Sequence, residues 1–244
     1  MEAMKPSAYS RGHLKAICAV LALAMVLTVL LSLAACGDSG SGDPKTILAQ
    51  ASTSMKKIKG FHFVYEVHKP SNAQPGTGLE IARITGDVNS AGDMQATIDV
   101  TQSSIPLSLK FVAVGDTQYI QNPLTQRWES VPVQESPVGS LNLNAGTIRI
   151  LDQLTETLYV GKEKKGGVET YHISGTATAA DVAAIAGAVS TTSPFPADVW
   201  VGVGDSLVYE VDIHGPATAN EDANIWRSIV LSNLDTFVDI KPPQ

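Results

Sequence analysis

The chain has 244 residues, a formal net charge of −7 and 44% hydrophobic residues, which suits one or two globular domains. The acidic balance argues against a nucleic-acid-binding protein, because such proteins gather Lys and Arg against the phosphate backbone. The two cysteines, Cys18 and Cys36, both lie near the N-terminus, so we expect no disulfide in the rest of the chain.

The N-terminal segment has the pattern of a secretory signal. Lys5, Arg11 and Lys15 precede an almost wholly apolar run over residues 16–35. That run ends in Leu-Ala-Ala followed by Cys36, which is typical of a lipobox, where the thiol receives a diacylglycerol and the preceding peptide bond is cut. A retained transmembrane anchor is the alternative, since ~20 apolar residues can span a bilayer.

The small residues before Cys36 and the Gly/Ser-rich segment after it favour cleavage and lipidation. We therefore expect a signal peptide over residues 1–35, a lipidated cysteine with a flexible linker over 36–43, and one domain over 44–244. Loss of the leader removes three basic residues and one acidic residue, so this domain is more acidic than the whole chain. Its predicted place is the extracytoplasmic face of the cell membrane, held by the lipid.

The first part of the domain reads as one helix followed by antiparallel hairpins. Asp43 suits an N-cap, Pro44 the first helical position and Gly60 the C-terminal stop, which predicts an amphipathic helix over 44–59. Beyond Gly60 the apolar residues alternate with a period of two, as in strands with one buried face. The predicted strands are 61–68, 79–89, 94–103, 107–111 and 117–121, and residues 122–146 are expected to form a long surface excursion.

The second part predicts two further helices and more hairpins. Thr147 is the expected cap of a short helix that carries Ile148, Leu151, Leu154 and Leu158. Thr178 with Asp181 three residues later resembles a capping box and opens an Ala-rich helix. The strands predicted around these helices are 159–164, 168–176, 197–203, 207–214 and 225–237.

Tight turns join neighbouring strands in this pattern, which favours antiparallel pairing over helical crossovers. The expected fold class is α+β: a single strongly curved, mostly antiparallel sheet, a half-barrel, with helices packed on its inner face and a hydrophobic cavity between them.

The sequence offers little for catalysis. The four histidines that follow the leader, His62, His68, His172 and His214, fall on strand faces or strand ends without the spacing of a zinc motif. Neither a nucleophile elbow nor a phosphate-binding loop is present. We therefore predict no enzyme, no metal and no cofactor; a hydrolase would need a serine or carboxylate pair to converge with one of these histidines.

Several short stretches, taken in order, resemble the mycobacterial-type LppX/LprAFG lipoprotein family. They are the lipobox at Cys36, the helix that ends near Gly60, residues 115–119 with Trp128 shortly after, residues 167–175, residues 196–201 and residues 232–243. The resemblance covers nearly the whole chain from Cys36 onward.

This resemblance implies a half-barrel, similar in fold to the periplasmic lipoprotein carriers, whose hydrophobic cavity holds the acyl chains of a lipid. It implies carriage of acyl lipids or glycolipids across the cell envelope, with a membrane lipid transporter as a possible partner and without catalytic residues. The expected cavity lining is Met55, Phe63, Tyr65, Ile98, Leu109, Phe111, Leu154, Ile185, Val201, Tyr209 and Val211.

One alternative to a lipid carrier stays open at this point. The same apolar residues would equally make a packed core, since a filled and a hollow interior share one pattern. The protein would then be a structural or adaptor lipoprotein that binds a protein partner through the curved sheet.

Overall fold

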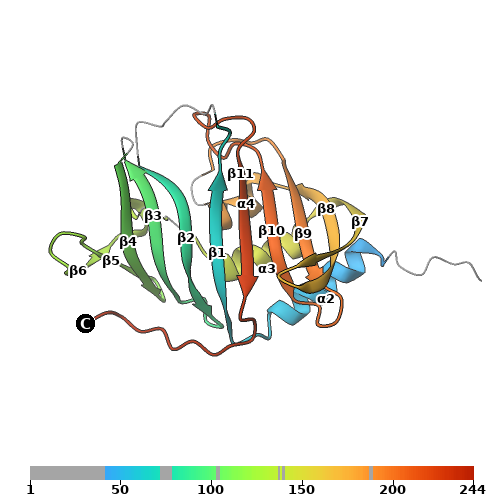
Figure 1. Ribbon diagram of the computed structural model, residues 1–244, viewed down its shortest axis with the longest axis horizontal. Helices are drawn as coiled ribbons and strands as arrows, with labels where there is room; N and C mark the ends of the chain where they lie inside the picture. The colour runs from blue at the N-terminus through green and yellow to red at the C-terminus, as the bar shows by residue number, and fades with distance from the viewer. Residues whose placement is uncertain (1–41, 72–78, 103–104, 137, 139–140, 187–188) are drawn as a thin grey trace, which may run out of the picture. The chain divides into compact units, whose positions relative to one another are not determined.

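The computed structural model describes residues 42–71, 79–102, 105–136, 138, 141–186 and 189–244. Residues 42–244 form one compact unit (Figure 1). The expected signal peptide and Cys36 lie outside the described residues.

The domain alternates helices with runs of strands. Its elements are α2 (Pro44–Met55), β1 (Gly60–His68), β2 (Leu79–Asn89), β3 (Met94–Gln102), β4 (Ile105–Val114), β5 (Thr117–Gln121), β6 (Trp128–Val131), the 3-10 turn η2 (Val133–Glu135), α3 (Leu143–Gln153), β7 (Thr155–Lys165), β8 (Val168–Ala177), α4 (Ala179–Ala186), β9 (Phe195–Gly202), β10 (Val208–His214) and β11 (Trp226–Ser232).

All eleven described strands belong to one antiparallel sheet. Their order is β6-β5-β4-β3-β2-β1-β11-β10-β9-β8-β7. Two meanders, β1 to β6 and β7 to β11, are therefore joined by the pairing of the first strand with the last, from His62 opposite Ser232 to His68 opposite Trp226. The sheet stays open, with β6 and β7 as its two edges, and the predicted α+β fold with a curved antiparallel sheet is confirmed.

Strand alternation places apolar side chains on one face of the sheet, called here the inner face. Phe61, Phe63 and Tyr65 of β1 are buried there, while His62 and Glu66 point to the opposite, outer face. The inner face and the helices share one hydrophobic cluster whose buried members run from Ile47 to Leu231, so the domain has a core of its own.

The helices cover one half of the inner face. In Figure 1, α2, α3 and α4 lie behind β1 and β11 to β7, while β3 to β6 extend beyond them. The backbone N–H of Val208 in β10 donates to the Met55 sulfur of α2 at 3.5 Å. α3 packs on both α2 and α4. A Cβ on Gly146 of α3 would lie 2.7 Å from Cγ1 of Ile185 in α4, so a glycine is needed where these helices meet.

Two sequence predictions were wrong in the middle of the chain. The helix predicted from Thr147 begins at Leu143, because the Asn142 side chain caps it by accepting from Ala145 N at 2.9 Å. It ends at Gln153, so Leu158 belongs to β7. The expected excursion over 122–146 contains a strand, β6, as well as η2 and the start of α3.

Candidate functional site

The inner-facing residues of β2, β3 and β4 form a continuous apolar surface, called here the inner lane. The strand register sets them side by side in five rows. From one end to the other the rows are Leu79, Gln102 and Ile105; Ile81, Val100 and Leu107; Ile84, Ile98 and Leu109; Gly86, Ala96 and Phe111; and Val88, Met94 and Ala113. Gln102 is the only polar member of this set.

On β2 and β4 the inner-lane residues are more exposed at the end that holds Leu79 and Ile105 than in the middle rows. On β4 the exposed fraction is 62% at Ile105, intermediate at Leu107 and Leu109, and 1% at Phe111. On β2 it falls from 43% at Leu79 to 1% at Ile84. The lane is therefore open to solvent at its first row and partly open at Leu107 and Leu109 on β4.

The length of the inner lane suits an acyl chain. Four steps of two residues at ~3.4 Å per residue give about 27 Å. One leaflet of a bilayer occupies half of a hydrocarbon core of ~30 Å. An extended acyl chain that fills one leaflet therefore fits within the lane.

The start of α3 stands at the far end of the inner lane. A Cβ on Gly92, in the β2–β3 turn, would lie 3.7 Å from Nδ2 of Asn142, the N-cap of α3. Asp93 in the same turn accepts from Gly115 N of the β4–β5 turn at 2.9 Å, which ties neighbouring hairpins together. This end is braced, whereas the end at Leu79 and Ile105 is exposed.

Two small residues, Gly86 and Ala96, lie side by side in the fourth row of the inner lane. Gly86 is required, because a Cβ there would lie 2.2 Å from the carbonyl oxygen of Gln95. Ala96 stands beside it and is only half-buried, although Ile98 and Met94, its inner-face neighbours on β3, are buried. In the row of Phe111 the inner lane therefore presents backbone and a methyl group, and β2 and β3 approach each other closely at Gly86.

The residues predicted to line a cavity divide between the two halves of the inner face. Ile98, Leu109 and Phe111 belong to the inner lane. Seven others, all buried, lie on the strands and helices of the helix-covered half: Met55, Phe63, Tyr65, Leu154, Ile185, Val201 and Val211.

Tyr209 lies outside the core cluster. An irregularity in the register between Val208 and Glu210 breaks the alternation, so Val208 takes the buried place and Tyr209 is only half-buried. Its hydroxyl donates to Asp205 at 2.7 Å, and burial, with the Asp205 carboxylate second, raises the Tyr209 pKa to about 12. Sequence reasoning also missed Leu79, Ile81, Ile105 and Leu107, whose signal was the alternation they share with Leu109.

The outer face carries a polar and aromatic network in place of an apolar surface. His172 lies between two carboxylates, with Nδ1 2.8 Å from Glu163 and Nε2 2.7 Å from Asp198. Its ring stacks on Trp200 at 4.5 Å, and Trp200 Nε1 donates to Glu163 at 2.6 Å. These groups partner one another, and the described part of the chain holds no cluster of three His, Cys, Asp or Glu side chains able to bind a metal.

Asp212 of β10 places a buried carboxyl on the outer face. The residue is 8% exposed and its Oδ1 has no hydrogen-bond partner. Burial raises the pKa of its carboxyl to about 7; Glu210 and Asp198 push in the same direction and Lys165 opposes them.

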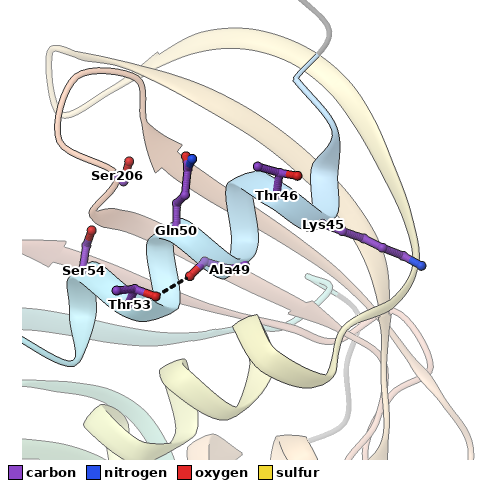
Figure 2. Close-up of a pocket in the computed structure, with 7 residues that line it drawn as sticks. All are labelled: Lys45, Thr46, Ala49, Gln50, Thr53, Ser54 and Ser206. Atoms are coloured by element: carbon purple, nitrogen blue, oxygen red, sulfur yellow. Dashed lines mark hydrogen bonds between the residues drawn. The ribbon is translucent and has the colours of Figure 1, made fainter.

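A pocket lies on the exposed side of α2. Figure 2 shows this pocket of about 570 Å³, which Ser206 of the β9–β10 turn borders. Apart from Ala49, every residue that lines it is polar or charged, and Thr53 uses its hydroxyl to donate to the Ala49 carbonyl at 2.9 Å. The inner lane offers a longer run of apolar side chains for an acyl chain to contact, so it is the better candidate site.

Comparison with known proteins places this chain among lipoproteins. Residues 43–240 match the sequence model of the LppX_LprAFG lipoprotein family. The lipoarabinomannan carrier protein LprG of Mycobacterium tuberculosis is 25% identical over 244 residues, covering 96% of this chain and 98% of that protein. Lipoprotein LprA of the same species is 26% identical over 220 residues, covering 80% and 88%.

Two solved structures share the fold. The crystal structure of LprF from Mycobacterium bovis matches with a TM-score of 0.62 at 19% identity, covering 84% of this chain and 99% of that one. LppX from Mycobacterium tuberculosis matches with a TM-score of 0.55 at 19% identity, covering 81% and 98%. Among the described residues, the helices are too short or too polar to cross a bilayer. The family match covers most of the sequence, and the chain belongs to the LppX_LprAFG family of lipoproteins.

Proposed function

We propose that this protein is a membrane-anchored lipoprotein that holds the acyl chains of a lipid or glycolipid along the inner lane and carries them across the cell envelope. Cleavage before Cys36 and lipidation of its thiol would tether the domain, with residues 37–43 as the linker. The name of LprG, a lipoarabinomannan carrier, supports a glycolipid as one class of ligand.

The observation that carries the proposal is the graded exposure of the inner lane. A packed core buries its apolar residues on all sides. Here the inner-face residues of β4 pass from 62% exposed at Ile105, through half-buried Leu107 and Leu109, to 1% at Phe111. A continuous apolar surface that is partly open to solvent is what an acyl chain requires.

The energetics suit transport. An acyl chain of ~14 methylenes gains ~11 kcal/mol on leaving water, at ~0.8 kcal/mol for each methylene. A bilayer offers a similar gain, so exchange between bilayer and protein is nearly neutral. The protein lowers the cost of moving the chains through water and needs no catalytic group for that task.

Lipid extraction tests the proposal. The domain expressed without its leader should yield acyl lipid on organic extraction and mass spectrometry. Leu109→Arg, which puts a charge into the inner lane, should lower the bound lipid at least tenfold. The matched control is Ser108→Arg, one residue away on the exposed outer face of β4, which should leave the lipid content unchanged.

Thermal unfolding of both variants checks that each of them still folds. The half-buried position of Leu109 lets the arginine head reach water, so the Leu109→Arg domain should still fold. A folded Leu109→Arg domain that keeps its lipid, or a wild-type domain without any bound lipid, would refute the proposed site.

A further inference from the structure

The open end of the inner lane carries two exposed aliphatic side chains in one register row. Leu79 of β2 and Ile105 of β4 stand on either side of Gln102 of β3. They are 43% and 62% exposed. We call this pair the rim.

The rim is continuous with the inner lane, unlike the other exposed apolar residues of the sheet. Leu158 on edge strand β7 is 63% exposed, but it lies opposite Ser174. Ser174 is paired with Asp198 of the outer-face network. Leu158 therefore has the same exposure as Ile105 without any connection to the candidate site.

The surroundings of the rim are close to electrically neutral. Lys69, just after β1, and Glu80, next to Leu79, form an ion pair at 2.7 Å. Their charges cancel, so the rim has no strong preference for an anionic or a cationic surface. Apolar side chains next to balanced charges suit the interface of a zwitterionic bilayer.

We propose that the rim inserts into the surface of a lipid bilayer and aligns the open end of the inner lane with the acyl chains of the membrane. This inference rests on the proposed lipid-carrying function and names the surface through which the lipid enters and leaves. A chain that slides from the bilayer past Ile105 toward Leu107 and Leu109 stays in contact with apolar side chains throughout.

The small size of the rim favours a bilayer over a second copy of the chain. A stable dimer buries about 800 Å² on each partner. The exposed parts of Leu79 and Ile105 together amount to about one whole aliphatic side chain, which falls far short of that area. A weak contact also suits a carrier that must leave the membrane surface again.

Site-specific labelling tests the inference. Both cysteines of the chain precede residue 42, so a single introduced cysteine can be labelled selectively in the domain that starts at Gly42, which has its own core. The environment-sensitive fluorophore NBD would be attached to Ile105→Cys and, as the control of equal exposure, to Leu158→Cys. Phosphatidylcholine vesicles containing nitroxide-labelled lipid are then added.

We expect a blue shift and nitroxide quenching at position 105 and no change at position 158. Equal quenching at both positions, or none at 105, would overturn the inference. So would a blue shift at 105 that depends on protein concentration and appears without vesicles, since that result identifies a second copy as the occupant.

A paired substitution measures how much the rim contributes to membrane docking. The double variant Leu79→Ser and Ile105→Ser should partition to the same vesicles about tenfold less than wild type, because it loses the equivalent of one aliphatic side chain. Because Leu79 and Ile105 also form the first row of the inner lane, the extractable lipid should fall as well, whereas Leu158→Ser should match wild type in both assays. Quenching at 105 in a domain without extractable lipid would refute the carrier function alone, and extractable lipid without quenching would refute docking alone.

Discussion

Replacing Asp212 by asparagine tests how the outer face responds to pH. The pKa of this carboxyl is raised from 3.8 to about 7, chiefly by burial and then by the Glu210 carboxylate. In the unfolded chain the same group titrates near 3.9. The folded state therefore holds the proton more tightly than the unfolded state does.

The sign of the effect follows from this difference. Below pH ~4 both states are protonated, and Asp212 makes no difference to stability. Between pH ~4 and ~7 the folded state binds the proton and the unfolded state does not, so stability falls as pH rises. Above pH ~7 the carboxyl is ionised in both states, and the full cost of burying the carboxylate lowers the stability of the folded state.

The magnitude can be bounded. A shift of about three units at 1.36 kcal/mol per unit gives a ceiling of ~4 kcal/mol. Water that reaches the neighbouring Lys165 and Glu210 screens the charge, so we take about half of it, or ~2 kcal/mol. For a domain of this size that corresponds to about 4–8 °C in Tm.

Thermal melts of wild type and Asp212→Asn from pH 4 to pH 8.5 check this reasoning. The variant should gain about 4–8 °C over wild type at pH 8 and little at pH 4. Asp116→Asn, in the exposed β4–β5 turn, is the matched control and should follow wild type throughout. A difference between Asp212→Asn and wild type that is the same at every pH would refute the assignment of a neutral, buried carboxyl.

Three further substitutions probe the core and the anchor. Arg227→Met should cost about 3 kcal/mol, because the buried guanidinium (3% exposed) donates to both carboxylate oxygens of Glu221, and its loss would leave that carboxylate, which also accepts from Ala217 N, without its cation. Gly146→Val should cost about 2 kcal/mol, because its Cβ would lie 2.7 Å from Cγ1 of Ile185 and force α3 away from α4. Cys36→Ala should release the domain from the membrane in cell fractionation and leave the lipid content of the domain unchanged.

The two core substitutions each have a control. Lys241→Met removes an exposed cation, and Gly161→Val adds a side chain where a Cβ meets nothing within 4 Å. Both variants should therefore unfold at the same temperature as wild type. If Arg227→Met or Gly146→Val melts like its control, the packing described around that residue is wrong. Loss of bound lipid in Cys36→Ala would contradict a purely tethering role for the cysteine.

Local chemistry made much of the fold predictable. The Asp43 side chain accepts from Thr46 N at 3.1 Å and caps α2 as expected. Thr178 N donates to Asp181 at 3.0 Å, as its capping box predicts. Alternation placed Phe63 and Tyr65 on the buried face of β1. Each of these features depends on residues only a few positions apart, which is the range over which a sequence pattern carries information.

Long-range packing set the limits of prediction. The pairing of β1 with β11 sets His62 opposite Ser232, and no local sequence pattern predicts a partner so distant in the chain. The irregularity next to Tyr209 breaks an alternation that seemed regular in sequence. The openness of the inner lane depends on which half of the sheet the helices cover, so Ile105 and Leu107 could not be told from ordinary core residues.

The most direct test of the central claim is to locate a bound acyl chain. The domain would be loaded with a phospholipid that carries a photoreactive diazirine on one acyl chain, irradiated, and digested for mass spectrometry. We predict crosslinks to the inner-lane residues of β4, foremost Leu107 and Leu109. Crosslinks confined to the α2 pocket around Gln50, or to the outer face around His172, would contradict the account.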